Sequence, residues 1–127
     1  MNADERRLNE ITRGIIGCAY RVGNTLGAGF LEKVYENSLA YELRKSGLTV
    51  ELQSRIKVQY DGVVVGDYLA DLLVEECVCV ELKVAKGLEE IHLAQCLNYL
   101  RAARLKVCLL INFGSPRVQI KRIVNRL

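Results

Sequence analysis

The segment 77–87, CVCVELKVAKG, combines the pattern of a buried β-strand with two charged side chains. Successive side chains of a strand point to opposite faces, so Glu81 and Lys83 share one face, together with Cys79. The other face has only apolar residues and is expected to belong to the core. Because burying an unpaired charge costs several kcal/mol, the sequence predicts that another charged group or a metal ion lies close to Glu81 and Lys83.

Apolar residues recur with helical or strand spacing along the rest of the chain. Three- and four-residue spacing predicts helices over about 5–23, 30–46 and 88–104. Alternating or continuous apolar runs predict strands over 49–52, 56–60, 63–75, 77–84, 107–113 and 117–124. The run 107–113 is nearly continuous in apolar residues, which is typical of a strand covered on both faces. We therefore expect one domain over 1–127 of the mixed α/β (α+β) class, ordered α-α-β-β-β-α-β-β, with a mixed central sheet flanked by helices.

Asp71 is expected to lie next to Glu81. The strand 63–75 is followed by the polar pair Glu75 and Glu76, which predicts a turn into the strand of Glu81. If the two strands pair in antiparallel fashion about this turn, residues whose numbers add up to about 151 to 153 face each other. Asp71 then lies opposite residues 79–81, and two carboxylates converge with the Lys83 ammonium.

A pair of neighbouring carboxylates favours a divalent cation. Like charges at close range either share a proton or bind a cation. Magnesium prefers oxygen ligands from one or two carboxylates and completes its shell with water and substrate phosphate. Asp71 and Glu81 supply such oxygens. Lys83, on the same face, is placed to contact an attacking water or the charge that develops on a phosphoryl group.

Cysteine usage and the distribution of apolar residues indicate the compartment. The five cysteines are scattered inside apolar runs, which is typical of a reducing environment where thiols pack as small apolar groups. His92 is the only histidine and the sequence has no C-x-x-C pair, so a structural zinc site is not expected. The first ten residues are rich in charge, and no segment has the ~18 consecutive apolar residues of a membrane span. We expect a cytoplasmic protein that does not enter a membrane.

Charge is distributed unevenly along the chain. Residues 1–82 contain 9 Lys and Arg against 13 Asp and Glu, whereas residues 83–127 contain 9 Lys and Arg against 2 Asp and Glu. The basic third could attract a phosphate backbone, or it could form a solvated rim without a ligand. Charge alone does not distinguish these two interpretations.

Asp71, followed ten residues later by Glu81-Leu82-Lys83, resembles the signature of the PD-(D/E)XK nuclease superfamily. Two further motifs agree with this resemblance. GFLEKVY (29–35) matches Gly-x-x-Glu-x-x-Tyr, and QCLNY (95–99) matches the Gln-x-x-x-Tyr element of RecB-like members. The chain is thus similar to the GxxExxY family over about residues 27–122.

The resemblance implies a restriction-endonuclease-like α-β-β-β-α-β core that cleaves phosphodiester bonds of DNA or RNA with Mg²⁺ or Mn²⁺. The metal ligands that it implies are Asp71, Glu81, the Leu82 carbonyl and Glu32. Lys83 would orient the attacking water or stabilise developing charge, and Gln95 would help to arrange the site.

Three further residues in or near these motifs have both a functional and a structural interpretation. Tyr35, Tyr99 and His92 are candidate substrate contacts. The tyrosines are also explained as core residues with a hydrogen-bonded hydroxyl, and His92 as a satisfied helix residue. For the whole chain, the alternative is a nuclease-fold module that binds nucleic acid or a protein without cutting. The intact acidic pair and lysine favour the nuclease, and the small domain is compatible with a homodimer or a protein partner.

Overall fold

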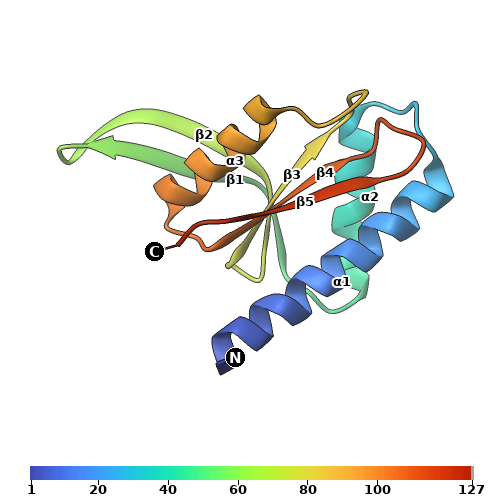
Figure 1. The fold of residues 1–127 in the computed structure, drawn as a ribbon, viewed down its shortest axis with the longest axis horizontal. Helices are drawn as coiled ribbons and strands as arrows, with labels where there is room; N and C mark the ends of the chain where they lie inside the picture. Colours follow the sequence, from blue (N-terminus) through green and yellow to red (C-terminus); the bar gives the residue numbers. More distant parts are fainter. Residues whose placement is uncertain (127) are drawn as a thin grey trace.

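The computed structural model describes residues 1–126, in which three helices pack around one twisted sheet (Figure 1). The helices are α1 (Ala3–Leu26), α2 (Glu32–Lys45) and α3 (Glu90–Ala103). The strands are β1 (Val50–Tyr60), β2 (Val63–Val74), β3 (Val78–Lys83), β4 (Val107–Asn112) and β5 (Gln119–Val124). The predicted element order is confirmed. None of the helices in the described residues is long and apolar enough to cross a bilayer.

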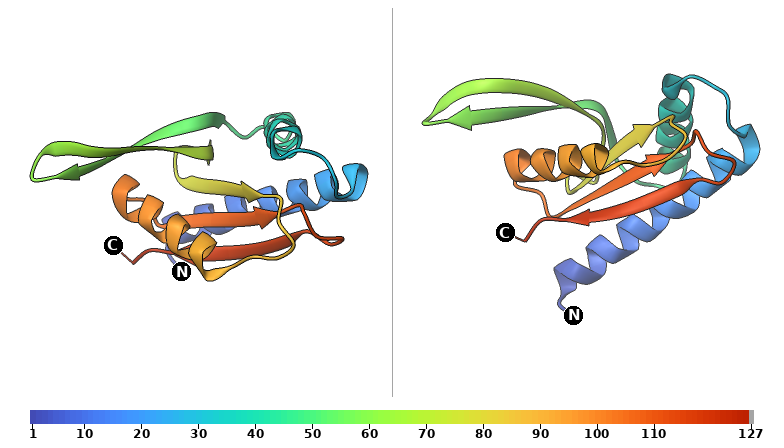
Figure 2. Two further views of the ribbon diagram at one scale, coloured as in Figure 1. Left: turned by 90° about the horizontal axis from the view of Figure 1, so that it is seen from above. Right: turned by 45° about the horizontal axis from the view of Figure 1, so that its top comes forward.

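The five strands form one mixed sheet in the order of the sequence. Neighbouring strands are antiparallel except β3 and β4, which run parallel and are joined through α3. A parallel pair needs a long crossover connection, and α3 supplies it. Figure 2 shows α1 and α2 on one side of the sheet and α3 on the other, in agreement with the two core clusters. The predicted sheet flanked by helices is therefore confirmed.

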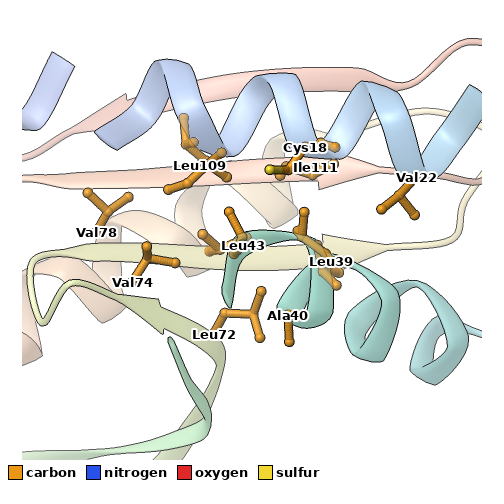
Figure 3. Packing of buried hydrophobic residues seen from close by; sticks show 14 of the residues in the cluster. Cys18, Val22, Leu39, Ala40, Leu43, Leu72, Val74, Val78, Leu109 and Ile111 are labelled. Carbon is orange, nitrogen blue, oxygen red and sulfur yellow. The ribbon is translucent and has the colours of Figure 1, made fainter. Parts of the chain in front are cut away.

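Both faces of the central strands are buried. The larger core cluster lies between the sheet and the helices α1 and α2 (Figure 3), and it includes Val78 and Leu82 of β3. The smaller cluster lies beneath α3 and includes Cys79. Every residue of β4 is buried, including Asn112 at its end, as expected for a strand covered on both faces. Glu81 consequently lies on a face that α3 covers.

The strands β1 and β2 form a long twisted hairpin that extends beyond the body of the domain (Figure 1). Asp61 and Gly62 both have positive φ (53° and 78°), as a two-residue hairpin turn requires. The two alternating segments 49–52 and 56–60 belong to one strand, Val50–Tyr60. Gln53 has a φ of 52°, yet the pairing with β2 keeps the same register on both sides of it. The hydrogen-bonded pairing with β2 therefore continues past Gln53, although the apolar alternation of the sequence breaks there.

Helix α1 continues beyond the predicted end at residue 23. Gly23 stays helical, and Gly27 ends the helix with a φ of 71° while its N–H donates to the Gly23 carbonyl (2.8 Å). A Cβ atom at Gly23 would collide with the Val118 side chain. The glycine at position 23 therefore allows close packing and does not terminate the helix.

Candidate active site

Asp71 of β2 and Glu81 of β3 lie side by side where the ladder between these strands ends. Leu72 pairs with Val80, so residues whose numbers add up to 152 face each other, as predicted. The Asp71 N–H donates to Glu81 Oε1 (3.0 Å), and the Leu82 N–H donates to Asp71 Oδ2 (2.7 Å). Each carboxyl thus accepts a hydrogen bond from the opposite strand, which fixes the two acids relative to each other.

Burial dominates the electrostatics of this pair. The exposed fraction of Glu81 is 4%. Burial, followed by the neighbouring Asp71 carboxylate, raises the pKa of Glu81 to about 10. Burial also raises the pKa of Asp71, although the hydrogen bond from the Leu82 N–H lowers it. Without a cation, Glu81 therefore holds a proton at neutral pH, and a bound cation would displace that proton.

Lys83 is the last residue of β3 and lies half-buried on the Glu81 face of the strand. Its ammonium lowers the pKa of Asp71 and the pKa of Glu32. The positive charge therefore lies within electrostatic range of both carboxyl groups. Lys83 thus lies near Asp71 and on the same strand face as Glu81, while its predicted role at the site stays a prediction.

Asn112, at the end of β4, holds the chain directly after Lys83. Its side chain is fully buried and accepts from the Ala85 N–H (3.0 Å) while donating to the Ala85 carbonyl (2.9 Å). Asn112 also accepts from the Gly114 N–H (2.9 Å). Asn112 was not predicted as a site residue, and its only signal in the sequence was a single amide at the end of an apolar run.

Helix α2 brings two further acids towards Asp71. Burial raises the pKa of Glu32, and the Asp71 carboxylate raises it further, although the Glu32 side chain remains exposed. Glu36, one turn later, is buried, raises the pKa of Asp71, and accepts from Lys33 Nζ (2.6 Å) and from Gln53 Nε2. Glu36 was not predicted as a site residue. The four-residue spacing between Glu32 and Glu36, which places both on one helix face, could have indicated it.

The donor set fits a hard divalent cation with few protein ligands. Asp71 and Glu81 present carboxyl oxygens, which magnesium prefers, and water can complete such a shell. The Leu82 side chain is buried in the core, so only its backbone carbonyl is a candidate ligand. Across residues 1–126, no group of three or more His, Cys, Asp and Glu side chains is gathered closely enough to hold a metal ion. Glu32 therefore does not form a close three-acid cluster with Asp71 and Glu81, which are the inner pair of the site.

Helix α3 closes the site from the other side. Gln95 Nε2 donates to the Tyr99 hydroxyl (2.8 Å). Burial raises the pKa of Tyr99, and the charges of Glu81 and Asp71 raise it further, which agrees with a phenol on the side of α3 that faces the acidic pair. His92 Nδ1 accepts from the Glu89 N–H (3.1 Å) at the start of the helix, as a satisfied helix residue does. Gln95 and Tyr99 thus lie on the site side of α3, whereas His92 caps the N-terminus of α3.

Tyr35 is a core residue that holds the loop before α2. Its ring is fully buried and stacks on Phe113 with centroids 4.7 Å apart. Its hydroxyl donates to the Gly27 carbonyl (2.5 Å) and accepts from the Phe30 N–H (3.2 Å). The structure therefore supports the core interpretation of Tyr35 and not a substrate contact. The residue fixes the loop that leads into α2 and hence the position of Glu32.

The family comparison agrees with these features. The model of the PD-(D/E)XK nuclease superfamily matches residues 9–123. The chain therefore belongs to the PD-(D/E)XK nuclease superfamily. A comparison with curated protein sequences gives no match.

Solved structures support the fold. The crystal structure of SSO0001 has a TM-score of 0.55 and 16% identity, covering 75% of this chain and 50% of the SSO0001 chain. An alkaline exonuclease (LHK-Exo) from Laribacter hongkongensis has a TM-score of 0.51 and 12% identity, covering 85% of this chain and 76% of the exonuclease. The chain thus spans half of the length of SSO0001. These likenesses confirm the restriction-endonuclease-like fold.

Proposed function

We propose that the protein is a magnesium- or manganese-dependent nuclease of the GxxExxY type, related to RecB-like nucleases, that hydrolyses phosphodiester bonds of DNA or RNA. The observation that carries the proposal is the pair of half-buried Asp71 and buried Glu81, whose carboxyl groups each accept a backbone N–H from the opposite strand, with Lys83 near Asp71. Placing a buried acid next to a half-buried one lowers the stability of the fold, and a bound divalent cation would offset that cost. Membership in a nuclease superfamily agrees with this proposal.

Each residue has a separate role in the proposed reaction. The cation ligands are assigned to Asp71, Glu81, the Leu82 carbonyl and, further out, Glu32. When bound, a divalent cation polarises the phosphoryl group and acidifies a water molecule. Lys83 orients the attacking water and stabilises the negative charge that develops on the phosphoryl oxygens. Gln95 positions groups on the α3 side of the site through its hydrogen bond to Tyr99.

Cleavage of labelled DNA and RNA, single- and double-stranded, with Mg²⁺ or Mn²⁺ tests the proposal. We expect wild type to cut at least one substrate, and EDTA to abolish cutting. Asp71→Asn, which removes a cation ligand, and Lys83→Ala, which removes a group that stabilises developing charge, should each lower the rate by roughly 10²- to 10³-fold. Lys86→Ala is the matched control, because Lys86 is an exposed lysine with no proposed role.

Two results would contradict the catalytic assignment. One is equal cleavage by wild type and by both folded site variants. The other is binding of nucleic acid or a protein with no cleavage of any substrate, which would favour the non-cutting module. Circular dichroism of each variant separates loss of a catalytic group from loss of the fold.

A further inference from the structure

A groove of about 1200 Å³ lies between the β1–β2 hairpin and α3. Figure 2 shows the two elements that form its walls, with the hairpin reaching out past the helix. Its lining includes Lys57 and Tyr68 on the hairpin and Tyr99, Arg101 and Arg104 on or directly after α3. Pockets for small molecules usually measure about 300–1,000 Å³. The groove therefore suits an extended ligand.

The charged groups of the groove are positive. Lys57, Arg101 and Arg104 are all exposed to solvent along its walls. In the part of the chain that the structure describes, no Asp or Glu lines the groove. An extended site with cations and no lining acid attracts a polyanion such as a nucleic-acid backbone.

The aromatic groups of the groove present a stacking surface. The rings of Tyr68 and Tyr99 lie with centroids 5.5 Å apart and planes tilted by 44°. Tyr99 is buried, whereas Tyr68 is 49% exposed, so Tyr68 offers its ring to a ligand. In a duplex, neighbouring base pairs cover both faces of each base. An unpaired base can therefore stack on Tyr68, whereas a base in the interior of a duplex cannot.

The groove approaches the acidic pair at Tyr99, although neither Asp71 nor Glu81 lines it. Gln95 and Tyr99 both line the groove, and they are hydrogen-bonded to each other (2.8 Å). The Tyr99 phenol also lies near Glu81, since that acid contributes to the raised pKa of Tyr99 after burial. A strand lying in the groove would therefore bring its backbone towards Asp71 and Glu81.

We propose that this groove binds a single-stranded polynucleotide, with one base stacked on Tyr68 and with backbone phosphates held by Lys57, Arg101 and Arg104. This inference rests on the proposed nuclease function and adds to it the form of nucleic acid that would reach the acidic pair. Binding itself needs no cleavage, so the two proposals can fail separately.

Fluorescence anisotropy in EDTA tests binding while cleavage is suppressed. The probes are single-stranded DNA, single-stranded RNA and the corresponding duplexes, all of equal length. Wild type should bind a single strand more tightly than a duplex. Tyr68→Ala should weaken single-strand binding by roughly 5- to 100-fold, the loss expected for one stacked base.

Tyr60→Ala is the matched control, because Tyr60 lies on the same hairpin, is 76% exposed and does not line the groove. It should change the Kd by less than about twofold, the range usual for an exposed side chain away from a site. Arg101→Ala gives an independent measurement, since losing one phosphate contact should lower the slope of log K against log salt by about 0.7.

Three results would overturn the inference: no binding by wild type, tighter binding of duplexes, or an equal effect of Tyr68→Ala and Tyr60→Ala. If Tyr68→Ala does not fold, an unchanged salt slope in Arg101→Ala overturns it instead. A preference for DNA or for RNA supports the groove and identifies the sugar. Intact single-strand binding without cleavage in Mg²⁺ would refute only the catalytic proposal.

Discussion

Glu81 shows how one side chain can be held in an unfavourable place. Its carboxyl is buried on the sheet face that α3 covers, where it accepts the Asp71 N–H. Its pKa in the folded protein is raised to about 10 from an ordinary value of 4.5. Between these values the folded state keeps a proton that the unfolded state has lost. Stability from this group is therefore complete below about pH 4.5 and is lost as the pH rises towards 10.

Replacing Glu81 by glutamine should remove this pH dependence, because glutamine has a similar shape, offers an oxygen to the Asp71 N–H and does not ionise. In EDTA, wild type should lose about 1 to 3 kcal/mol more than Glu81→Gln between pH 6 and pH 8, since one group contributes at most ~1.4 kcal/mol per pH unit. Urea unfolding at the two pH values measures the difference. Equal losses would show that Glu81 is ionised in the metal-free protein.

Two glycines of helix α1, Gly17 and Gly23, have different surroundings. Gly17 has open space around the position of a Cβ atom, whereas at Gly23 the Val118 side chain occupies that position. Both residues are helical. Close contact between α1 and the segment before β5 therefore depends on Gly23 and not on Gly17.

The same substitution at these two positions should have opposite effects. Gly17→Ala should stabilise the protein by about 0.5–1 kcal/mol through helix propensity. Gly23→Ala gains the same propensity but should be destabilising by about 1–3 kcal/mol, because Val118 must move. Chemical denaturation of both variants beside wild type measures the two values. Stabilisation by both would mean that Val118 can move aside freely.

The whole molecule assembles the candidate site from three layers. The sheet supplies Asp71, Glu81 and Lys83, α2 adds Glu32 and Glu36 from one side, and α3 adds Gln95 and Tyr99 from the other. A cation bound to the inner pair would contact only the folded chain. Its binding free energy should therefore appear as folding stability.

Magnesium should raise the Tm of wild type, by an amount that corresponds to about 2.7 kcal/mol when Mg²⁺ is at 100 times its Kd. Asp71→Asn should lose most of this increase. Asp67→Asn should keep it, because Asp67 lies on the hairpin and pairs with Arg55 (3.3 Å). Differential scanning calorimetry with Mg²⁺, and with NaCl at equal ionic strength, measures the effect. An increase shared by all three proteins would indicate screening and not a bound cation.

Local patterns predicted the inner part of the site. The two-residue period placed Glu81 and Lys83 on one face, and the short turn at 75–76 set the register that brings Asp71 beside Glu81. The same patterns were insufficient for β1, where pairing with β2 continues the strand through the polar segment around Gln53. They also missed Asn112 and Glu36, whose partners lie far away in the sequence.

Strand periodicity and turn length act over a few residues, so they were enough to predict the order of the elements, the acidic pair and the lysine on the same strand face. Three features could be found only in the folded chain: the approach of Glu36 to Asp71, the core position of Tyr35, and the groove between the hairpin and α3. These features depend on how helices pack on the sheet. Such packing is set by many side chains at once and has no local period that a sequence can display.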